Sequence, residues 1–546
     1  HSWEIISPDL TTDDPEKQRD SGGEIYNDNT AAEFHTTILT IAESPVEEGV
    51  IWVGTDDGNV QISQDGGESW TNVRDNVPGL PEAAWIGNIE ASPTERGTAF
   101  MAVDNHRMDD FAPHLWTTTD YGESWTDLSE GLPQDDYAKV VRQHPDNPDL
   151  LFVGMDRGIQ ASFDRGESWV DLRLGLPRVS VRGIKIQDQY DDLVIGTHGR
   201  GAFILDDLGP LVDLTEAMAS NVHLFPVRTA TDWESMNRDT NLGDSYYTGE
   251  NPEEGAYVNF WLAEVPARPM AAEEGETAGS NGGAGAGGSM AREDGDAPVT
   301  VRISTADGRT VREIAVDSAR AGVNRVVWDL TWEPAEPVEG EEEEDGFRGG
   351  PSGPPVAPGT YTATLVAGDR ERSTDFRVRG DPAVEISAAD YAAREDAALR
   401  ARDLETRINR MINAINDLTA QVEATLEAVE GKDLADADEI RRVGREAVER
   451  LDSLEYQLHR PPPDMGYRQW PRLSEQLSFV NRGITGGQAR PTEGHLQVLD
   501  EIQADAEERA RELQALIDTT IGELNRLLEG EGRILPGWSR SRPVSE

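Results

Sequence analysis

The chain has 546 residues, of which 104 are acidic and 49 are basic, and its net charge at pH 7 is −55. Such an acidic surface repels nucleic acids and anionic lipids and suits a protein from a high-salt environment, where screening removes the self-repulsion. The sequence has no apolar run of about 18 residues and no cysteine, which excludes a membrane span, disulfides and thiol catalysis.

The length exceeds what one hydrophobic core supports, so several domains are expected. The patterns described below predict β-propeller blades over residues 1–215, a β-sandwich over 216–380 and a helical bundle over 381–546. The fold class is therefore mainly β and multidomain. A calcium-binding role for the acidic residues would need oxygen ligands at defined spacing, and the sequence contains no twelve-residue calcium loop.

A Ser/Thr-x-Asp-x-Gly-x-x-Trp box occurs three times in the first predicted domain, at 63–70, 118–125 and 162–169. In each box, Asp accepts backbone hydrogen bonds in a tight turn, Gly allows positive φ, and Trp packs beneath the turn. These needs are structural, so the box residues are predicted to build the fold and not to catalyse a reaction. They are Asp65, Gly67 and Trp70; Asp120, Gly122 and Trp125; and Asp164, Gly166 and Trp169.

The segments around the boxes repeat as well. A β-rich run precedes each box and Gly-Leu-Pro follows it, and a last unit at 193–207 matches Gly196–Asp206 to Gly154–Asp164. About four short strands in every 45–55 residues predict propeller blades. Four blades are visible, and we expect them to belong to a larger propeller. Ser2-Trp3 looks like the end of a further box, so the protein is expected to extend upstream.

Residues 264–298 are rich in Ala, Gly and Glu, which predicts a flexible insertion. Beyond it, a hairpin around Asp307-Gly308 and further alternating segments predict an antiparallel β-sandwich of immunoglobulin type. Trp328 and Tyr361 are expected in its core.

From residue 386 onward the pattern is helical. Apolar residues from Leu404 to Val429 are spaced alternately by four and three, and Pro461–Pro463 interrupt the helical pattern. A final helix is expected to begin at Thr492 as its N-cap. The apolar seam is either the internal core of an antiparallel bundle or a dimerising coiled coil, so a homodimer through these helices remains open.

The boxes resemble the repeats of bacterial sialidases and of sortilin-type propellers. More closely, "WVGTDDGNVQIS", "TTDYGESW" and "GTHGRGAFILDD" are similar to large exported bacterial proteins that are often called BNR-repeat glycosyl hydrolases. In those proteins a propeller precedes an immunoglobulin-like module and a helical region. "GVNRVVWDL" with "APGTYTATL" resembles the immunoglobulin-like fold of flagellar hook-capping proteins. The resemblance implies architecture and an exported location (periplasmic, cell-surface or secreted), although no signal peptide is present in this sequence.

Polar residues recur directly after a strand at an equivalent point of each blade, where propellers bind ligands at the mouth of the tunnel. The predicted ligand-binding residues are Asp56, Asp104, His106, Arg107, Arg157, His198 and Arg200. Asp57 and Asp109 are the candidate catalytic pair, because a glycosidase needs two carboxyl groups about 5–10 Å apart.

Two other chemistries are weaker interpretations of the same residues. Arg107, Arg157 and Arg200 would suit a sialidase, which binds its substrate's carboxylate through arginines. His106 and His198 near aspartates would suit a metal, but hydrogen bonding within loops is the better interpretation. No metal site and no cofactor are therefore predicted.

The repeats and the appended modules favour a protein that binds a glycan, a peptide or a protein at the tunnel face. The alternative is a glycoside hydrolase, sialidase-like or endo-glucanase-like, with part of its site in upstream blades.

Overall fold

The computed structural model describes residues 3–19, 35–82, 84–173, 175–233, 249, 251–266, 298–340, 353–430, 436–460, 470–528, 533–534 and 536. The chain divides into two compact units, His1–Ala219 and Ser220–Glu546. The first predicted domain falls in the first unit, and the other two predicted domains share the second unit. The division into three domains stays a prediction.

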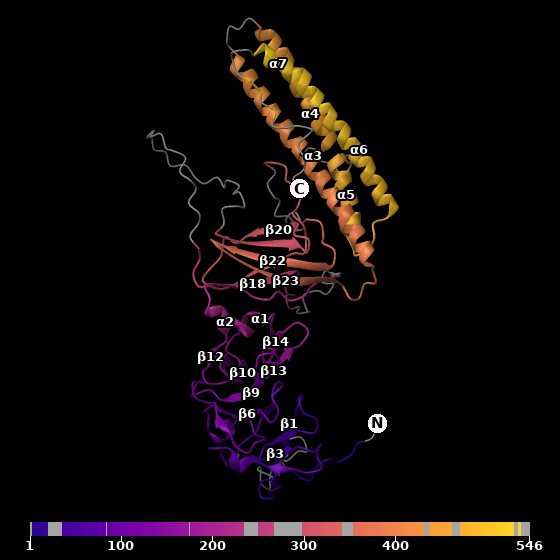
Figure 1. Ribbon diagram of the computed structural model, residues 1–546. Coiled ribbons are helices and arrows are strands. Elements are labelled where there is room, and N and C mark those ends of the chain that lie inside the picture. The colour runs from indigo at the N-terminus through magenta and orange to yellow at the C-terminus, as the bar shows by residue number, and fades with distance from the viewer. Residues whose placement is uncertain are drawn as a thin grey trace, which may run out of the picture. The chain divides into compact units, whose positions relative to one another are not determined.

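Four antiparallel sheets follow one another in the first unit, coloured indigo to magenta in Figure 1. The first contains β1 (Ile38–Glu43), β2 (Ile51–Thr55), β3 (Val60–Ser63) and β4 (Thr71–Asn72). The second contains β5 (Asn88–Ala91), β6 (Ala99–Val103), β7 (His114–Thr118) and β8 (Thr126–Asp127). The third contains β9 (Ala138–Gln143), β10 (Leu151–Met155), β11 (Gly158–Ser162) and β12 (Val170–Asp171). The fourth contains β13 (Val181–Gln187), β14 (Asp192–Thr197) and β15 (Ala202–Leu205).

Strand order within each sheet follows the sequence, so hairpins and short turns join neighbouring strands. The first strands of consecutive sheets contact one another, β1 with β5, β5 with β9 and β9 with β13. Apolar side chains between sheets form shared cores, in which Trp52 of the first sheet packs with Ile89 and Met101 of the second. This arrangement of short meandering sheets is consistent with the predicted succession of propeller blades.

Each box closes the turn between the third and fourth strands of its sheet. Asp65 accepts hydrogen bonds from the Ser69 N–H at 2.8 Å, the Ser69 hydroxyl at 2.6 Å and the Ser63 hydroxyl at 2.9 Å. Equivalent donors surround the other two box aspartates: Ser124 and Thr118 at Asp120, and Ser168 and Ser162 at Asp164. Each carboxylate thereby pins both sides of its turn.

The three box glycines share one backbone conformation, and two of the three box tryptophans make the same kind of hydrogen bond. Gly67, Gly122 and Gly166 have φ values of 98°, 85° and 94°, which glycine adopts at little cost. Trp125 lies edge-on to Trp52, with 5.9 Å between the ring centroids. The indole N–H groups of Trp70 and Trp169 donate to backbone carbonyls at 3.0 Å. The contacts around all three boxes therefore belong to the fold.

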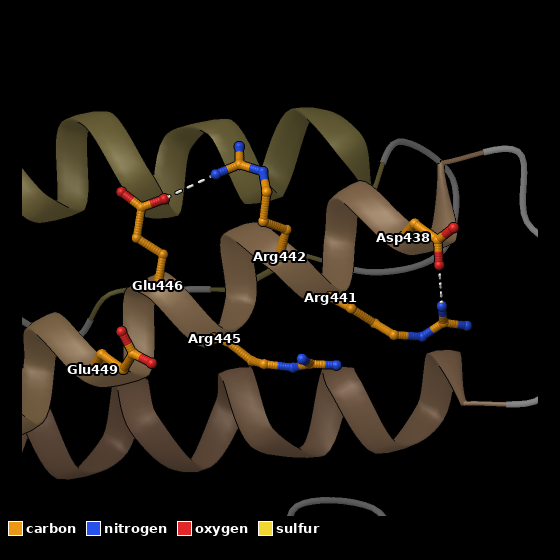
Figure 2. Close-up of a pocket in the computed structure, with 6 residues that line it drawn as sticks. All are labelled: Asp438, Arg441, Arg442, Arg445, Glu446 and Glu449. Atoms are coloured by element: carbon orange, nitrogen blue, oxygen red, sulfur yellow. Dashed lines mark hydrogen bonds and ion pairs between the residues drawn. The ribbon is translucent and has the colours of Figure 1, made fainter.

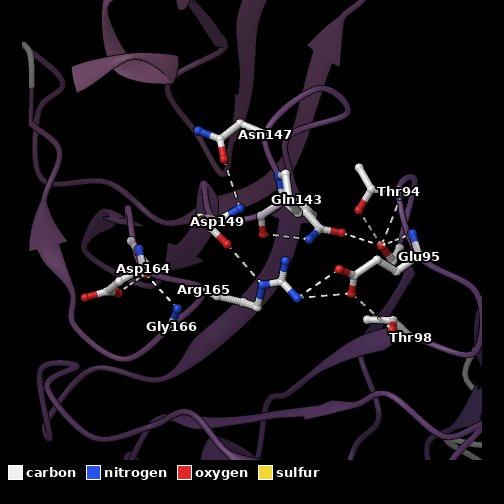
Figure 3. A network of polar contacts seen from close by, with 12 residues as sticks. Thr94, Glu95, Thr98, Gln143, Asn147, Asp149, Asp164, Arg165 and Gly166 are labelled. Atoms are coloured by element: carbon white, nitrogen blue, oxygen red, sulfur yellow. Dashed lines mark hydrogen bonds and ion pairs between the residues drawn. The ribbon is translucent and has the colours of Figure 1, made fainter. Parts of the chain in front are cut away.

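Side chains link neighbouring sheets at the end that carries the boxes, which we call the box end. Arg165 donates to Glu95 Oε1 at 2.9 Å, in the turn between β5 and β6, and to Asp149 Oδ1 at 3.2 Å (Figure 3). One sheet earlier, the Tyr121 hydroxyl donates to Glu47 Oε2 at 2.8 Å. These links between sheets indicate a structural role for the box end.

The fourth sheet departs from the repeat. Gly154 pairs with Ile159 in the third sheet, whereas Gly196 pairs with Ala202 in the fourth, so the second of these hairpins is one residue longer. The predicted match between residues 196–206 and 154–164 is therefore wrong by one residue along β15. No fourth strand follows, and the described chain continues into the short helices α1 (Gly209–Val212) and α2 (Leu214–Met218).

Two sheets form the first part of the second unit. One contains β16 (Val222–Leu224), β18 (Ala256–Leu262) and β21 (Gly322–Trp328). The other has the order β17 (Ala230–Asp232), β23 (Arg370–Gly380), β22 (Gly359–Ala367), β19 (Val299–Thr305) and β20 (Thr310–Ala315). They share one core, in which the expected aromatics Trp328 and Tyr361 are confirmed. The hairpin around Gly308 is also confirmed.

The sandwich differs from a purely antiparallel one, because β17 pairs with β23 in parallel. The immunoglobulin type stays a prediction. Most of the predicted insertion at 264–298 lies outside the described residues.

The remaining helices are α3 (Ala388–Val429), α4 (Ala437–Leu458), α5 (Leu473–Thr485), α6 (Glu493–Leu516), the π-helical η5 (Ile517–Ile521) and α7 (Gly522–Leu527). The predicted N-cap is confirmed, since the Thr492 hydroxyl accepts from the His495 N–H. The seam of α3, which includes Leu404, Met411 and Leu418, is buried in a core shared with α4, α5 and α6. The seam therefore has partners within the chain, and dimerisation through these helices stays a prediction. Among the described helices, none has the length and apolar character needed to cross a membrane.

Candidate ligand-binding site

One backbone hydrogen bond recurs in all four sheets of the first unit. The residue directly after the second strand donates its N–H to the carbonyl of a residue just before the first strand. The pairs are Asp56 to Thr37 at 3.0 Å, Asp104 to Trp85 at 3.2 Å, Asp156 to Tyr137 at 3.2 Å and His198 to Ser180 at 2.8 Å. Three of the predicted ligand-binding residues, Asp56, Asp104 and His198, thus hold positions equivalent to that of Asp156, and all four lie at the end of the sheets opposite the boxes. We call this the hairpin end.

A buried lysine joins two of these positions. The ammonium of Lys139 lies 3.2 Å from Asp104 Oδ2 and 3.6 Å from Asp156 Oδ1, and its side chain is only 4% exposed. The same nitrogen lies 4.1 Å from the centre of the Tyr137 ring. Two carboxylates and an aromatic face therefore compensate the charge that burial would otherwise destabilise. Lys139 fixes the second and third sheets relative to each other at the hairpin end.

His106 extends this cluster. It lies in the 3₁₀ turn η2 (His106–Met108), and its Nδ1 bonds to Asp104 Oδ1. Its ring stacks on Tyr137 with 4.6 Å between the centroids, and Phe111 meets the same ring edge-on at 6.1 Å. The Asp104 carboxylate thus lies between an imidazole and an ammonium, and the structure brings the predicted residues Asp104 and His106 into contact.

Arg107 lies over a second aromatic face. Its guanidinium carbon is 3.7 Å from the centre of the Trp85 ring, and the arginine itself is exposed. When an arginine stacks on tryptophan, the N–H donors at the edge of its planar guanidinium group stay free to bind a ligand. The pairing therefore offers both an aromatic face and a cation at the hairpin end.

Asp136 and Asp156 have pKa values shifted in opposite directions. Burial raises the pKa of Asp136, whose Oδ1 is buried with no hydrogen-bond partner in the described part of the chain and whose Oδ2 accepts from the Arg157 N–H at 3.2 Å. Burial alone would also raise the pKa of Asp156, but the hydrogen bond from Tyr137 and the charge of Lys139 hold it below its usual value. Acid–base catalysis uses one carboxyl with a raised pKa and one with a lowered pKa.

Asp57 anchors the N-terminal segment to the first sheet. Its Oδ2 accepts from the N–H and the hydroxyl of Thr12, both at 2.6 Å, and its Oδ1 accepts from Thr55. Burial alone would raise the pKa of Asp57, but these hydrogen bonds outweigh it and the pKa lies below its usual value. Asp57 is therefore ionised, which suits a base or nucleophile better than an acid.

The side chains of the other predicted residues do not join the cluster around Lys139. Asp109 is exposed with φ at 63° in the hairpin between β6 and β7, whereas Asp57 lies in the hairpin between β2 and β3. Asp56 accepts from the Thr37 N–H at 2.7 Å. Arg157 donates to Asp135 Oδ2 at 3.0 Å, and His198 and Arg200 are exposed in the hairpin between β14 and β15. The pair of Asp57 and Asp109 stays a prediction.

Sequence reasoning missed Lys139, Tyr137, Trp85 and Asp136. They lie before or at the start of the first strands, whereas the predicted residues follow the second strands. The repeated hydrogen bond places the residues before the first strands and the residues after the second strands together at the hairpin end. Comparing the segments before the first strands at the period of the repeat would therefore have identified them. Within the described ranges, no group of three or more His, Asp or Glu side chains is arranged to hold a metal ion.

A hollow of about 570 Å³ on α4 has a different character. It is lined by charged side chains that pair along the helix, such as Arg441 with Asp438 at 2.6 Å and Arg442 with Glu446 at 3.1 Å (Figure 2). Pairs three or four residues apart are usual on a solvated helix face. This surface is therefore not included in the candidate site.

No family model and no curated protein matches the chain. Solved structures do. YCF48 from Cyanidioschyzon merolae matches at 17% identity and a TM-score of 0.23 over 31% of this chain and 53% of that one. The GH74 xyloglucanase from Xanthomonas campestris matches at 16% identity and 0.22, over 29% of this chain and 26% of that one. An ancestral GH74 enzyme matches at 15% identity and a TM-score of 0.23, over 42% of this chain and 31% of that one. The chain thus spans about half or less of these proteins, and similarity at such TM-scores carries no argument about activity.

Proposed function

We propose that the hairpin end of the first unit binds a glycan, a peptide or a protein ligand. One observation carries this proposal: four consecutive sheets hold a polar residue at the same place by the same backbone hydrogen bond, at Asp56, Asp104, Asp156 and His198. A repeated row of polar side chains beside aromatic rings suits an extended ligand with many hydrogen-bonding groups. An exported location and the resemblance to Asp-box propellers belong to the same proposal.

The ligand class can be tested by screening the full chain in molar salt against immobilised glycans and peptides. Arg107→Ala and Arg200→Ala alter exposed side chains of the hairpin end. Arg96→Ala, at an arginine that is also exposed and lies in the turn between β5 and β6, is the matched control at the box end. We expect the two hairpin-end variants to weaken binding and the control to leave it unchanged. Binding that only Arg96→Ala weakens would place the ligand at the wrong end of the sheets for this proposal.

A glycoside hydrolase is the second candidate, and the opposite pKa shifts of Asp136 and Asp156 favour it. In such an enzyme the neutral carboxyl donates a proton to the leaving oxygen and the ionised carboxyl acts as base or nucleophile. Asp57 and Asp109 remain the alternative pair. Hydrolysis of a glycan panel distinguishes the two pairs of carboxyl groups. Asp136→Asn abolishes turnover if Asp136 and Asp156 act, and the double variant Asp57→Asn with Asp109→Asn abolishes it if Asp57 and Asp109 act. Turnover unaffected by either change would exclude both pairs.

A further inference from the structure

An apolar hollow lies between two helices of the bundle. α5 and α6 contact each other (Figure 1), and an open hollow of about 570 Å³ lies along their contact. Its lining comprises Phe479, Val480, Gly483, Gly494 and Val498, together with two polar side chains that are described below. Sites that bind small molecules typically have this size and a mostly apolar lining with few polar groups.

The apolar wall of this hollow is partly exposed. Phe479 and Val498 are 74% and 38% exposed, whereas Val480 is buried in the core of the bundle. A ligand that removes such apolar surface from water gains free energy of binding, and exposed apolar patches in soluble proteins often mark binding sites. The two exposed side chains therefore provide a surface for a hydrocarbon group.

One cation belongs to the lining. Arg482 is exposed, and within the described ranges no hydrogen bond or ion pair engages its guanidinium. The arginine before it in the sequence, Arg472, lies 4.1 Å from the centre of the Tyr456 ring. The arginine after it, Arg490, donates to Asp390 at 3.1 Å. A free guanidinium beside apolar walls suits a carboxylate, to which it can donate two parallel hydrogen bonds.

The first turn of α6 adds to this positive character. Gly494 and His495 are its second and third residues, where backbone N–H groups give the helix end a partial positive charge. Glu493, the first residue, does not line the hollow, whereas His495 does. The Nδ1 atom of His495 is buried and has no hydrogen-bond partner in the described part of the chain. Apolar walls thus meet a guanidinium, a helix N-terminus and an imidazole with an unsatisfied nitrogen.

Glycines on both helices shape the hollow. A Cβ added at Gly483 would meet His495 Nε2 at 2.9 Å, so glycine lets the imidazole lie against α5. A Cβ added at Gly494 would meet only Thr492 Oγ1, at 3.8 Å. The space beside Gly494 is therefore open.

We propose that this hollow binds an unbranched apolar carboxylate, which is the chemistry of a fatty acid. The carboxylate lies at Arg482 and the first turn of α6, and the hydrocarbon chain lies against Phe479 and Val498. In molar salt, charges are screened beyond about 3 Å, so the net charge of −55 does not repel the anion and the local cation decides the sign of the ligand.

A peptide fits the hollow less well. It would bring backbone N–H and C=O groups against apolar walls, and each group left unpaired there costs free energy. A hydrocarbon chain has no such groups, and a neutral or cationic amphiphile would leave Arg482 without an anion. The apolar walls and the single guanidinium therefore select the two ends of the ligand.

Calorimetric titration of the full chain with octanoate in molar salt tests the charged end. We expect saturable binding of one octanoate per chain. Arg482→Gln should raise the dissociation constant for octanoate about 10-fold and leave that for octanol, which has the same tail and no charge, unchanged. Arg445→Gln is the matched control, because Arg445 is an exposed arginine on α4, and it should change neither constant.

Filling the hollow tests the apolar end. Gly494→Leu should abolish binding of both octanoate and octanol without lowering the melting temperature of the free protein, since leucine favours a helix more than glycine does. If this variant is less stable, Arg482→Gln still tests the site, because it changes only an exposed side chain. No saturable binding of octanoate, equal dissociation constants in wild type and Arg482→Gln, or binding that Gly494→Leu leaves intact would each overturn the proposal.

A short apolar peptide with a free C-terminal carboxylate, titrated beside octanoate, tests the choice of ligand. We expect it to bind more weakly than octanoate. If it binds more tightly, and if Arg482→Gln and Gly494→Leu weaken that binding, the hollow takes a polypeptide and the proposal is wrong.

Discussion

Asp65, Asp120 and Asp164 each accept hydrogen bonds from a serine four residues later and from a hydroxyl two residues earlier, whereas Asp136 has a buried oxygen without a donor in the described residues. The same type of side chain thus has a lowered pKa where hydroxyl and N–H donors surround it and a raised pKa where burial dominates. The spacing of donors around the box aspartates follows from the box itself, so these hydrogen bonds could be predicted from the sequence. The setting of Asp136 depends on burial between segments, which no local pattern records.

Replacing Asp164 by alanine should lower the free energy of unfolding by about 1–2 kcal/mol, because the Ser168 N–H and the Ser162 hydroxyl lose their acceptor. Asp188→Ala, at an exposed aspartate between β13 and β14, should change it by about 0.5 kcal/mol or less. Denaturant unfolding of the two variants beside the wild type measures both values. Equal effects would show that the box hydrogen bonds do not stabilise the turn.

The box aspartates also predict an acid dependence. Hydrogen bonds from Ser69 lower the pKa of Asp65 from 3.8 to about 2. Because the folded pKa lies below the unfolded one, the contribution of Asp65 is fully present above about pH 4 and is lost as the pH falls toward 2. The difference in stability between wild type and Asp65→Asn should therefore shrink over that interval. A difference that grows with acidification would contradict the assigned hydrogen bonds.

At the scale of elements, the hairpin end is held together by groups from different sheets. Lys139 of β9 lies between carboxylates that follow β6 and β10. The strands, their order and the equivalence of the blades could be predicted from the period of the boxes. The contact of Lys139 with both carboxylates could not, since it depends on how consecutive sheets approach one another. The hairpin before β15 is one residue longer than the corresponding hairpin of the third sheet. Because glycines stand on both sides of the extra residue, the two sequences align without a gap and the difference was not predicted.

Lys139→Met should lower the free energy of unfolding by about 3 kcal/mol, because the change leaves two carboxylates facing each other without the ammonium between them. Lys185→Met is the matched control, since Lys185 lies exposed on β13. Thermal unfolding at neutral pH compares the two. If both variants unfold at the same temperature, the buried ammonium does not hold the second and third sheets together.

For the whole molecule, the net charge of −55 predicts that the folded state depends on salt. Screening weakens the repulsion among the excess carboxylates, so the melting temperature should rise as salt increases toward molar concentration, by about 2–4 °C for each kcal/mol gained. An uncharged osmolyte at the same osmolality is the control, and it should raise the melting temperature less. Equal effects of salt and osmolyte would argue against repulsion as the cause.

The composition and the repeats, taken over the whole chain, predicted a mainly β first unit and a helical C-terminal part, and the described structure has both. The function of the hairpin end depends on side chains that converge from separate segments, such as Arg107 on Trp85 and Lys139 between Asp104 and Asp156. The sequence patterns predicted one residue of each contact, Arg107 and Asp104. Their partners Trp85 and Lys139 are identified only by the structure, which places the strands in register.

The most direct test of ligand binding at the hairpin end is calorimetric titration, in molar salt, of the glycan or peptide that screening identifies. The titration compares wild type, Arg107→Ala and Arg96→Ala. We expect Arg107→Ala to raise the dissociation constant by about 10-fold to 100-fold, which corresponds to about 1.4–2.8 kcal/mol, and Arg96→Ala to leave it unchanged. An unchanged dissociation constant for Arg107→Ala together with a raised one for Arg96→Ala would show that the box end, and not the hairpin end, is the binding surface.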